Sequence, residues 1–141
     1  MSEFFTGEDI SSGDYKLSKS QDYDKFLLGL AGIAEARRSE LESATPLITI
    51  SKDGDEWNIT EKSELGIKET KFQMGEAFDD VLLNGVGTKS IASEHGPFLI
   101  LMHTPLDGSD MVSVSHEFLE NQVRVSLSVR DAAAVRIFDR L

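Results

Sequence analysis

The sequence predicts an all-β domain, a ten-stranded antiparallel up-and-down β-barrel whose mouth is covered by a short helix–turn–helix lid. One observation is the series of turn dipeptides Asp53-Gly54, Asn84-Gly85 and Asp107-Gly108, which is typical of consecutive β-hairpins. A second is the alternation of apolar and polar residues between these turns. A third is that helical periodicity is confined to residues 20–43, so two helices follow a single strand and precede a long meander. Closing that meander into a barrel protects its edges, and the helices then cover one end.

The length of 141 residues suits one compact domain, which we place at residues 13–141 after an N-terminal extension of residues 1–12. The net charge of −11 disfavours nucleic acids and anionic membrane surfaces as partners. No apolar run approaches the ~20 residues that a membrane-spanning helix needs, so stable membrane insertion is not expected. Cysteine is absent and no signal-peptide pattern opens the chain, so we expect a cytoplasmic protein. We also expect a monomer.

A short amphipathic helix is predicted after Ser20, which suits the N-cap position. Apolar residues follow at positions i, i+3, i+4 and i+7, which places on one face Tyr23, Phe26, Leu27 and Leu30. Strong helix formers then fill residues 33–43, and Pro46 ends this second helix. The break between the two helices falls at Ala31-Gly32.

Ten strands are expected, one before the helices and nine after them, each bounded by a turn signal. Their approximate ranges are 13–19, 46–52, 55–62, 66–73, 77–83, 86–94, 97–104, 110–118, 121–129 and 132–140. Side chains no longer fill a barrel of more than about eight strands, so a cavity is expected inside it.

Alternation in the last three strands indicates which side chains face that cavity. The apolar face of strand 110–118 carries Val112, Val114, His116 and Phe118. Strand 121–129 repeats the pattern with Val123, Val125, Leu127 and Val129. The last strand alternates less cleanly, with one set formed by Ala132, Ala134, Arg136 and Phe138 and the other by Ala133, Val135, Ile137 and Asp139. Periodicity alone does not decide which of these two sets faces inward.

Several short stretches match one known family in the same order along roughly residues 13 to 141. They are Gly13-Asp14-Tyr15-Lys16-Leu17 with Ser20, Asp22-Tyr23-Asp24, Pro46 before Asp53-Gly54-Asp55, and Arg136-Ile137-Phe138. The most specific stretch is Lys71-Phe72-Gln73-Met74-Gly75-Glu76-Ala77-Phe78-Asp79-Asp80, which is similar to a Phe-x-Leu-Gly-x-x-Phe segment. In these stretches the chain resembles the fatty-acid-binding family of intracellular lipid-binding proteins.

The resemblance implies a ten-stranded barrel, or clam, that encloses a water-containing cavity and carries a fatty acid or similar lipid through the cytosol. Members of the family commonly bind the ligand carboxylate with two arginines and a tyrosine. Arg136 matches the second arginine, whereas Phe138 stands at the tyrosine position and His116 at that of the first arginine. One cation is therefore expected in the cavity. Arg136 is predicted to hold an anionic head, with His116 as a secondary donor whose protonation is opposed by burial.

The resemblance also assigns further residues to the cavity or to its entrance. These are Tyr23, Pro46, Leu65, Asn84, Val114, Val125 and Leu127. Leu65 stands where the family often places a portal phenylalanine, and Ile33 and Arg37 are expected on the other side of that portal. Each assignment has a structural alternative. A strand arginine can face solvent, a histidine can be a hydrogen-bonded core residue, and the apolar residues can serve only as packing.

The function predicted from these residues is non-enzymatic binding and intracellular transport of a long-chain fatty acid or similar hydrophobic ligand. Because Phe138 offers no donor, a carrier of a neutral lipid or retinoid stays open. So does a ligand-free interaction scaffold. An enzyme using His116 as acid or base is a further alternative, although no activated nucleophile accompanies it, and no catalytic residue is assigned. No cofactor is expected, and no metal site, since His95, His103 and His116 lie apart without a carboxylate at ligand spacing.

Overall fold

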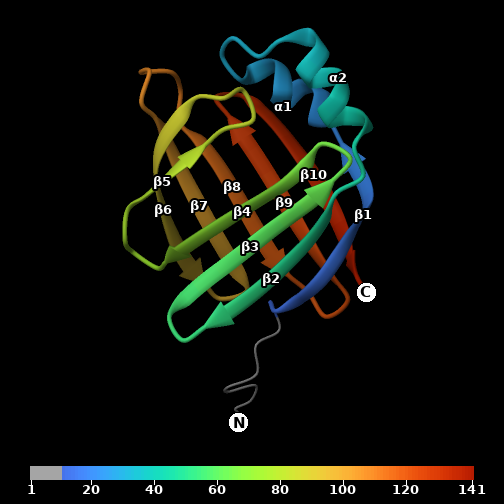
Figure 1. Cartoon of the computed structure of the whole chain (residues 1–141), viewed down its shortest axis with the longest axis vertical. Coiled ribbons are helices and arrows are strands. Elements are labelled where there is room, and N and C mark those ends of the chain that lie inside the picture. Colours follow the sequence, from blue (N-terminus) through green and yellow to red (C-terminus); the bar gives the residue numbers. More distant parts are fainter. Residues whose placement is uncertain (1–10) are drawn as a thin grey trace.

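The computed structural model describes residues 11–141, which form ten antiparallel strands curled into a barrel and two short helices over one end (Figure 1). The predicted fold class is confirmed. The expected extension, residues 1–12, lies outside the described residues except for its last two positions. The strands are β1 (Gly13–Gln21), β2 (Leu47–Asp53), β3 (Glu56–Ser63), β4 (Gly66–Gln73), β5 (Phe78–Val81), β6 (Gly87–His95), β7 (Phe98–Pro105), β8 (Val112–Phe118), β9 (Gln122–Val129) and β10 (Ala132–Arg140).

All ten strands belong to one sheet, in the order β4-β3-β2-β1-β10-β9-β8-β7-β6-β5. β4 and β5 are its two ends and are not paired with each other, so the predicted closure of the barrel is incomplete at this one seam. Side chains bridge the seam between β4 and β5 instead. Lys68 Nζ lies 3.1 Å from Asp80 Oδ1 and donates a hydrogen bond to the Val81 carbonyl oxygen at 2.9 Å. Further along, the rings of Phe72 and Phe78 stack with their centroids 5.4 Å apart.

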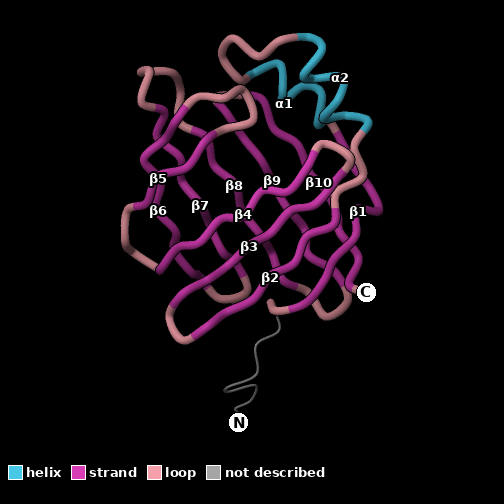
Figure 2. The backbone as a smooth tube through the Cα atoms, in the orientation of Figure 1, coloured by secondary structure: helices cyan, strands magenta, loops and turns pink. Residues whose placement is uncertain are grey.

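The lid consists of α1 (Tyr23–Gly29) and α2 (Glu35–Ser43), which lie together over one end of the barrel (Figure 2). α1 rests against β9 and β10. Its last residue, Gly29, approaches the sheet so closely that an added Cβ would lie 2.6 Å from Val129 Cγ1. The helices separate at Ala31-Gly32 as predicted. Neither helix within residues 11–141 has the length and apolar character needed to cross a membrane.

The predicted helix cap at Ser20 is wrong. β1 continues to Gln21, because Ser20 and Gln21 pair with Arg136 and Val135 of β10. The residue that precedes α1 is Asp22, which has a φ of 61° and makes no side-chain capping hydrogen bond. Sheet pairing therefore places Ser20 beside Arg136, and its hydroxyl accepts a hydrogen bond from Arg136 Nε at 3.2 Å.

The three predicted turn dipeptides all lie where consecutive strands of the sheet are joined, with Asp53 as the last residue of β2. Their glycines, Gly54, Gly85 and Gly108, have φ values of 63°, 87° and 84°, in the left-handed region that side chains disfavour. Two strands are shorter than predicted by more than one residue. β8 begins at Val112 and not at residue 110. β5 spans Phe78–Val81 and not the expected 77–83, because the chain turns at Leu82, whose amide donates to the Val86 carbonyl.

The inward faces of β8 and β9 agree with the predicted alternation. In β10 the sequence left open which of two sets of residues faces inward. The structure buries Ala134, Arg136 and Phe138, so their set is the inward one. Far from the lid, the Trp57 ring stacks with Phe72 and with Phe118 at centroid distances of 6.2 and 6.3 Å and fills that end of the barrel. The end beneath the lid is hollow.

Candidate functional site

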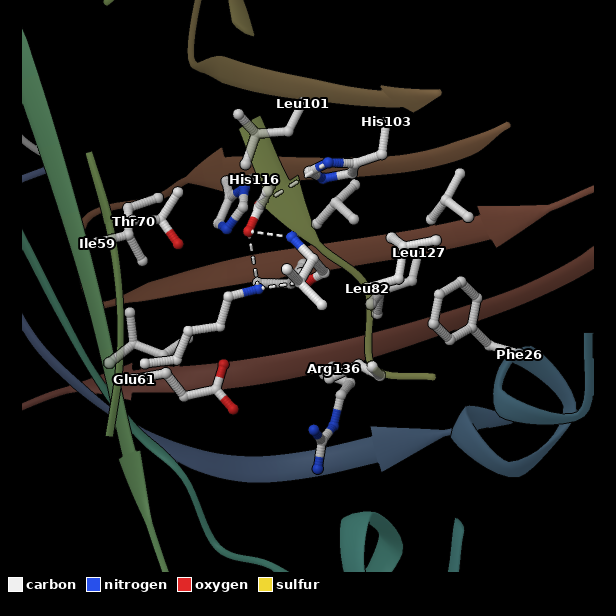
Figure 3. Close-up of a pocket in the computed structure, with 18 of the residues that line it drawn as sticks. Phe26, Ile59, Glu61, Thr70, Leu82, Leu101, His103, His116, Leu127 and Arg136 are labelled. Carbon is white, nitrogen blue, oxygen red and sulfur yellow. Dashed lines mark hydrogen bonds and ion pairs between the residues drawn. The ribbon is translucent and has the colours of Figure 1, made fainter. Parts of the chain in front are cut away.

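A cavity of about 160 Å³ lies inside the barrel beneath α1 (Figure 3). A cavity of this size has room for several waters or for an alkyl chain. Most of its wall is apolar, and a few charged and polar side chains project among the apolar ones. The residues that line it are Tyr23, Phe26, Leu30, Ile48, Ile59, Glu61, Lys68, Thr70, Asp80, Val81, Leu82, Leu83, Leu101, His103, Val112, Val114, His116, Val125, Leu127, Arg136 and Phe138.

Seven of the ten predicted ligand-binding residues belong to this lining. They are Tyr23, Val114, His116, Val125, Leu127, Arg136 and Phe138. The register of the sheet explains how the polar ones meet: Val125 of β9 pairs with His116 on one side and with Arg136 on the other. Because neighbouring strands lie about 4.8 Å apart, the Cα atoms of His116 and Arg136 are roughly 10 Å apart at one level of the barrel.

The other three predicted residues lie outside the lining. Pro46 is buried at the start of β2, where its carbonyl accepts a hydrogen bond from the Leu17 amide. Leu65 is exposed on the turn between β3 and β4. Asn84 uses its amide group to join the β5–β6 loop to the lid, since Nδ2 donates to the Ala31 carbonyl oxygen at 2.8 Å. Ligand contact by these residues stays a prediction.

The predicted portal residues on α2 and before it lie at the lid rather than in the cavity wall. Arg37 Nε donates to the carbonyl oxygen of Leu83 at 3.4 Å, and Leu83 itself lines the cavity. Ile33 is half-buried and packs against the core. Arg37 and Asn84 therefore tether the helices to the β5–β6 loop, and a role for this contact in ligand entry remains a prediction.

Arg136 projects from β10 into the cavity and is only 6% exposed. Besides its bond to Ser20, its guanidinium carbon lies 3.8 Å from the centroid of the Tyr23 ring, a cation–π contact. Burial lowers the pKa of Arg136 below its ordinary value and Tyr23 and Glu61 oppose that shift, so the guanidinium stays charged. Burial also raises the pKa of Tyr23 to about 12, so its phenol is neutral.

Sequence reasoning misses three charged residues of the wall. Glu61 of β3, Lys68 of β4 and Asp80 of β5 line the cavity, and Lys68 makes the expectation of a single cation wrong. A signal for the first two exists in the sequence. Glu61 lies four residues after Trp57 and Lys68 four residues before Phe72, so each shares the inward face of its strand with a core aromatic residue.

A row of polar side chains extends from β6 and β7 to Asp80 of β5 at the cavity wall. Thr88 Oγ1 lies 2.7 Å from Ser90 Oγ, which lies 2.7 Å from His103 Nδ1. Asp80 Oδ2 lies 3.9 Å from the same nitrogen, and burial nevertheless lowers the pKa of His103. In a Ser-His-Asp relay the serine and the aspartate contact opposite ring nitrogens, so this geometry does not fit one. Residues 11–141 hold no cluster of three side chains suited to a metal ion.

His116 is the second buried histidine of the cavity wall. It is 5% exposed, and its Nδ1 makes no hydrogen bond with any part of the chain that the structure describes. Burial lowers the pKa of His116 from 6.5 to about 4, so the ring is neutral at physiological pH. A neutral imidazole has one donor and one acceptor nitrogen. The cavity therefore offers a neutral polar group at this position and not a cation.

The lowered pKa of His116 predicts a specific loss of stability in acid. Between about pH 6.5 and pH 4 the unfolded chain binds a proton at this residue and the folded chain does not, so the free energy of unfolding falls as the pH falls. We expect this contribution to reach about 3 kcal/mol at pH 4 and to disappear in His116→Gln. Urea denaturation of both proteins across this pH range measures it, with the exposed His95→Gln as control. Equal pH dependence in the wild type and His116→Gln would contradict the prediction.

Comparisons with known proteins give relatives that span nearly the whole chain. No protein-family model matches it. A fatty acid-binding protein of Tyrophagus putrescentiae is 30% identical over 129 residues, which cover 92% of this chain and 96% of that protein. The 14 kDa fatty acid-binding protein of Schistosoma mansoni is 27% identical over 129 residues, with the same coverage of both chains.

Solved structures share the fold. A structure of the Schistosoma mansoni fatty acid binding protein in complex with arachidonic acid superposes with a TM-score of 0.88 at 25% identity, covering 94% of this chain and 97% of that one. The cavity described above combines an apolar wall with a buried guanidinium. That combination suits a ligand with an apolar chain and an anionic head.

Proposed function

The chain belongs to the fatty-acid-binding protein family, and we propose that it binds a long-chain fatty acid in its cavity and transports it through the cytoplasm. The observation that carries this proposal is the hollow, mostly apolar interior with the Arg136 guanidinium inside it. An interaction scaffold has no need of such a cavity. A neutral lipid makes no use of a buried guanidinium, whereas a carboxylate forms charge-assisted hydrogen bonds with it.

In the proposed complex the two parts of the ligand meet different parts of the wall. The carboxylate binds Arg136, with Tyr23 and His116 as neutral polar neighbours. The alkyl chain lies against the apolar wall, including Val125 and Phe138, and each buried methylene contributes about 0.8 kcal/mol before entropic costs. The tail supplies most of the affinity, and the cation supplies selectivity for an acid.

We propose binding without chemical turnover, by a monomer. The relatives carry the names of binding proteins, and the His103 cluster lacks relay geometry. Absence of cysteine agrees with a reducing compartment such as the cytoplasm.

Displacement of a fluorescent fatty-acid analogue tests the proposed function. Oleate is expected to displace the analogue from the purified, delipidated protein, and native mass spectrometry is expected to recover oleate of unchanged mass. Failure of the analogue and of oleate to bind would favour a scaffold. Displacement by retinol or oleyl alcohol more effectively than by oleate would favour a carrier of neutral lipids.

A further inference from the structure

One carboxylate of the cavity has no role in the proposed function. Glu61 lines the cavity from β3, and Figure 3 shows its carboxylate projecting into the same part of the cavity as the guanidinium of Arg136. Lys68 is the cross-strand partner of Glu61 on β4, but its ammonium group is already held by Asp80 and by the Val81 carbonyl. Glu61 is therefore the carboxylate that remains for Arg136.

The ligand-free cavity is balanced in charge. Its wall holds two cations, Arg136 and Lys68, and two carboxylates, Glu61 and Asp80. Glu61 and Arg136 influence each other's pKa electrostatically. The side chains in direct contact with Arg136 include the Ser20 hydroxyl and the Tyr23 ring, which carry no charge. A bound fatty-acid carboxylate adds a third negative charge to the cavity. It binds near the Arg136 guanidinium, which already has the Glu61 carboxylate in the same part of the cavity.

Two carboxylates that share one cation in a poorly solvated site do not both stay ionised without a large cost. The pair then titrates as a unit, and one member holds a proton at a pH where it would otherwise be charged. Glu61 is the fixed member of this pair, and once protonated its O–H becomes a hydrogen-bond donor for the ligand carboxylate. That donor is chemically useful here because Phe138 supplies none.

We propose that Glu61 takes up one proton from solvent when an anionic lipid binds Arg136, so that fatty-acid binding by this chain is coupled to proton uptake. The inference rests on the proposed function and names the residue that couples it to pH. No covalent bond changes, since the proton moves from water or buffer to the Glu61 carboxylate.

The charges around Glu61 set the direction of the pH effect. Burial raises the pKa of Glu61, and Arg136 of β10 and Lys68 of β4 partly oppose that rise. Tyr23 of α1 faces the same group as a neutral phenol, and Arg37 of α2 interacts electrostatically with that phenol. A bound carboxylate raises the pKa of Glu61 further. Affinity for the lipid should therefore fall as pH rises from the pKa of Glu61 in the free protein to its higher pKa in the complex.

Isothermal titration calorimetry measures the proton directly. Oleate is titrated into the full chain near neutral pH in phosphate and in Tris, whose ionisation enthalpies differ strongly, and the difference in heat gives the number of protons bound. We expect an uptake approaching one proton per oleate for the wild type and close to none for Glu61→Gln. Glu56→Gln, an exposed glutamate of the same strand, serves as matched control and should behave as the wild type. Oleyl alcohol, which brings no charge, should cause no uptake.

The affinities provide a second readout. Glu61→Gln keeps a donor at this position and removes the competing charge, so its oleate affinity should be nearly independent of pH and exceed that of the wild type in alkali. The wild-type affinity should fall by up to about tenfold per pH unit between the two pKa values of Glu61, that of the free protein and that of the complex.

Binding of oleate to the wild type without proton uptake overturns this inference and leaves the proposed function standing. Equal uptake by Glu61→Gln also overturns it, because the proton is then on the ligand or elsewhere. No binding of oleate at all overturns the proposed function itself.

Discussion

Replacing Arg136 by glutamine is expected to lower the affinity for oleate by roughly ten- to a hundredfold. A hydrogen bond to a charged group contributes about 1.5–3 kcal/mol, and each 1.4 kcal/mol changes a dissociation constant about tenfold. The effect should be large because Arg136 lies inside the barrel at 6% exposure, where bulk water does not screen it. Displacement of a fluorescent analogue by oleate gives the two affinities.

Two controls separate the loss of charge from general damage. Arg124→Gln removes an arginine from the outer face of the adjacent strand β9, where its side chain is 47% exposed and faces Glu117, and should leave oleate affinity unchanged. Oleyl alcohol should bind the wild type and Arg136→Gln about equally, since it brings no carboxylate. A loss of oleate affinity of no more than twofold in a folded Arg136→Gln would rule out a carboxylate site at Arg136.

The sequence predicts the barrel because its signals are local. Turn dipeptides such as Asp53-Gly54 require backbone conformations that glycine adopts, and alternation in β8 and β9 separates core from solvent residue by residue. The cap at Ser20 fails for a non-local reason. Whether a serine caps a helix or extends a strand depends on a partner strand more than a hundred residues away, and here β10 pairs with it.

The charged part of the site is harder to predict because the wall of a hollow space accepts polar side chains that a packed core excludes. Glu61 and Lys68 occupy inward positions at the hollow end of β3 and β4, where a charged residue is tolerated, and their polarity alone is typical of a solvent-facing residue. Trp57 and Phe72 occupy the same faces at the packed end. The alternation of side chains along a strand therefore predicts which face such a residue lies on. Its residue type predicts only whether its surroundings are polar or apolar.

Replacing Phe72 by alanine is expected to lower the free energy of unfolding by about 3–5 kcal/mol, the range for removing a buried phenylalanine ring. Phe72 is 3% exposed, stacks on Trp57 within the barrel, and meets the Phe78 ring of β5 across the seam. No backbone pairing joins β4 to β5, so the ring contact supplies apolar closure that the sheet lacks. Urea denaturation followed by tryptophan fluorescence measures the loss.

The same substitution at Phe98 distinguishes closure of the seam from the loss of any aromatic ring. Phe98 is 38% exposed at the start of β7, between paired neighbours, so Phe98→Ala should cost less than about 1 kcal/mol. Hydrogen exchange adds a local readout, because loss of the Phe72 ring should accelerate exchange of amides in β4 and β5 more than in β8 and β9. Equal losses of stability in the two variants would mean that the Phe72 ring adds no closure of its own and that the contacts of Lys68 with Asp80 and Val81 hold the seam. In that case the packed end of the barrel would be an ordinary core and not the element that keeps the cavity closed.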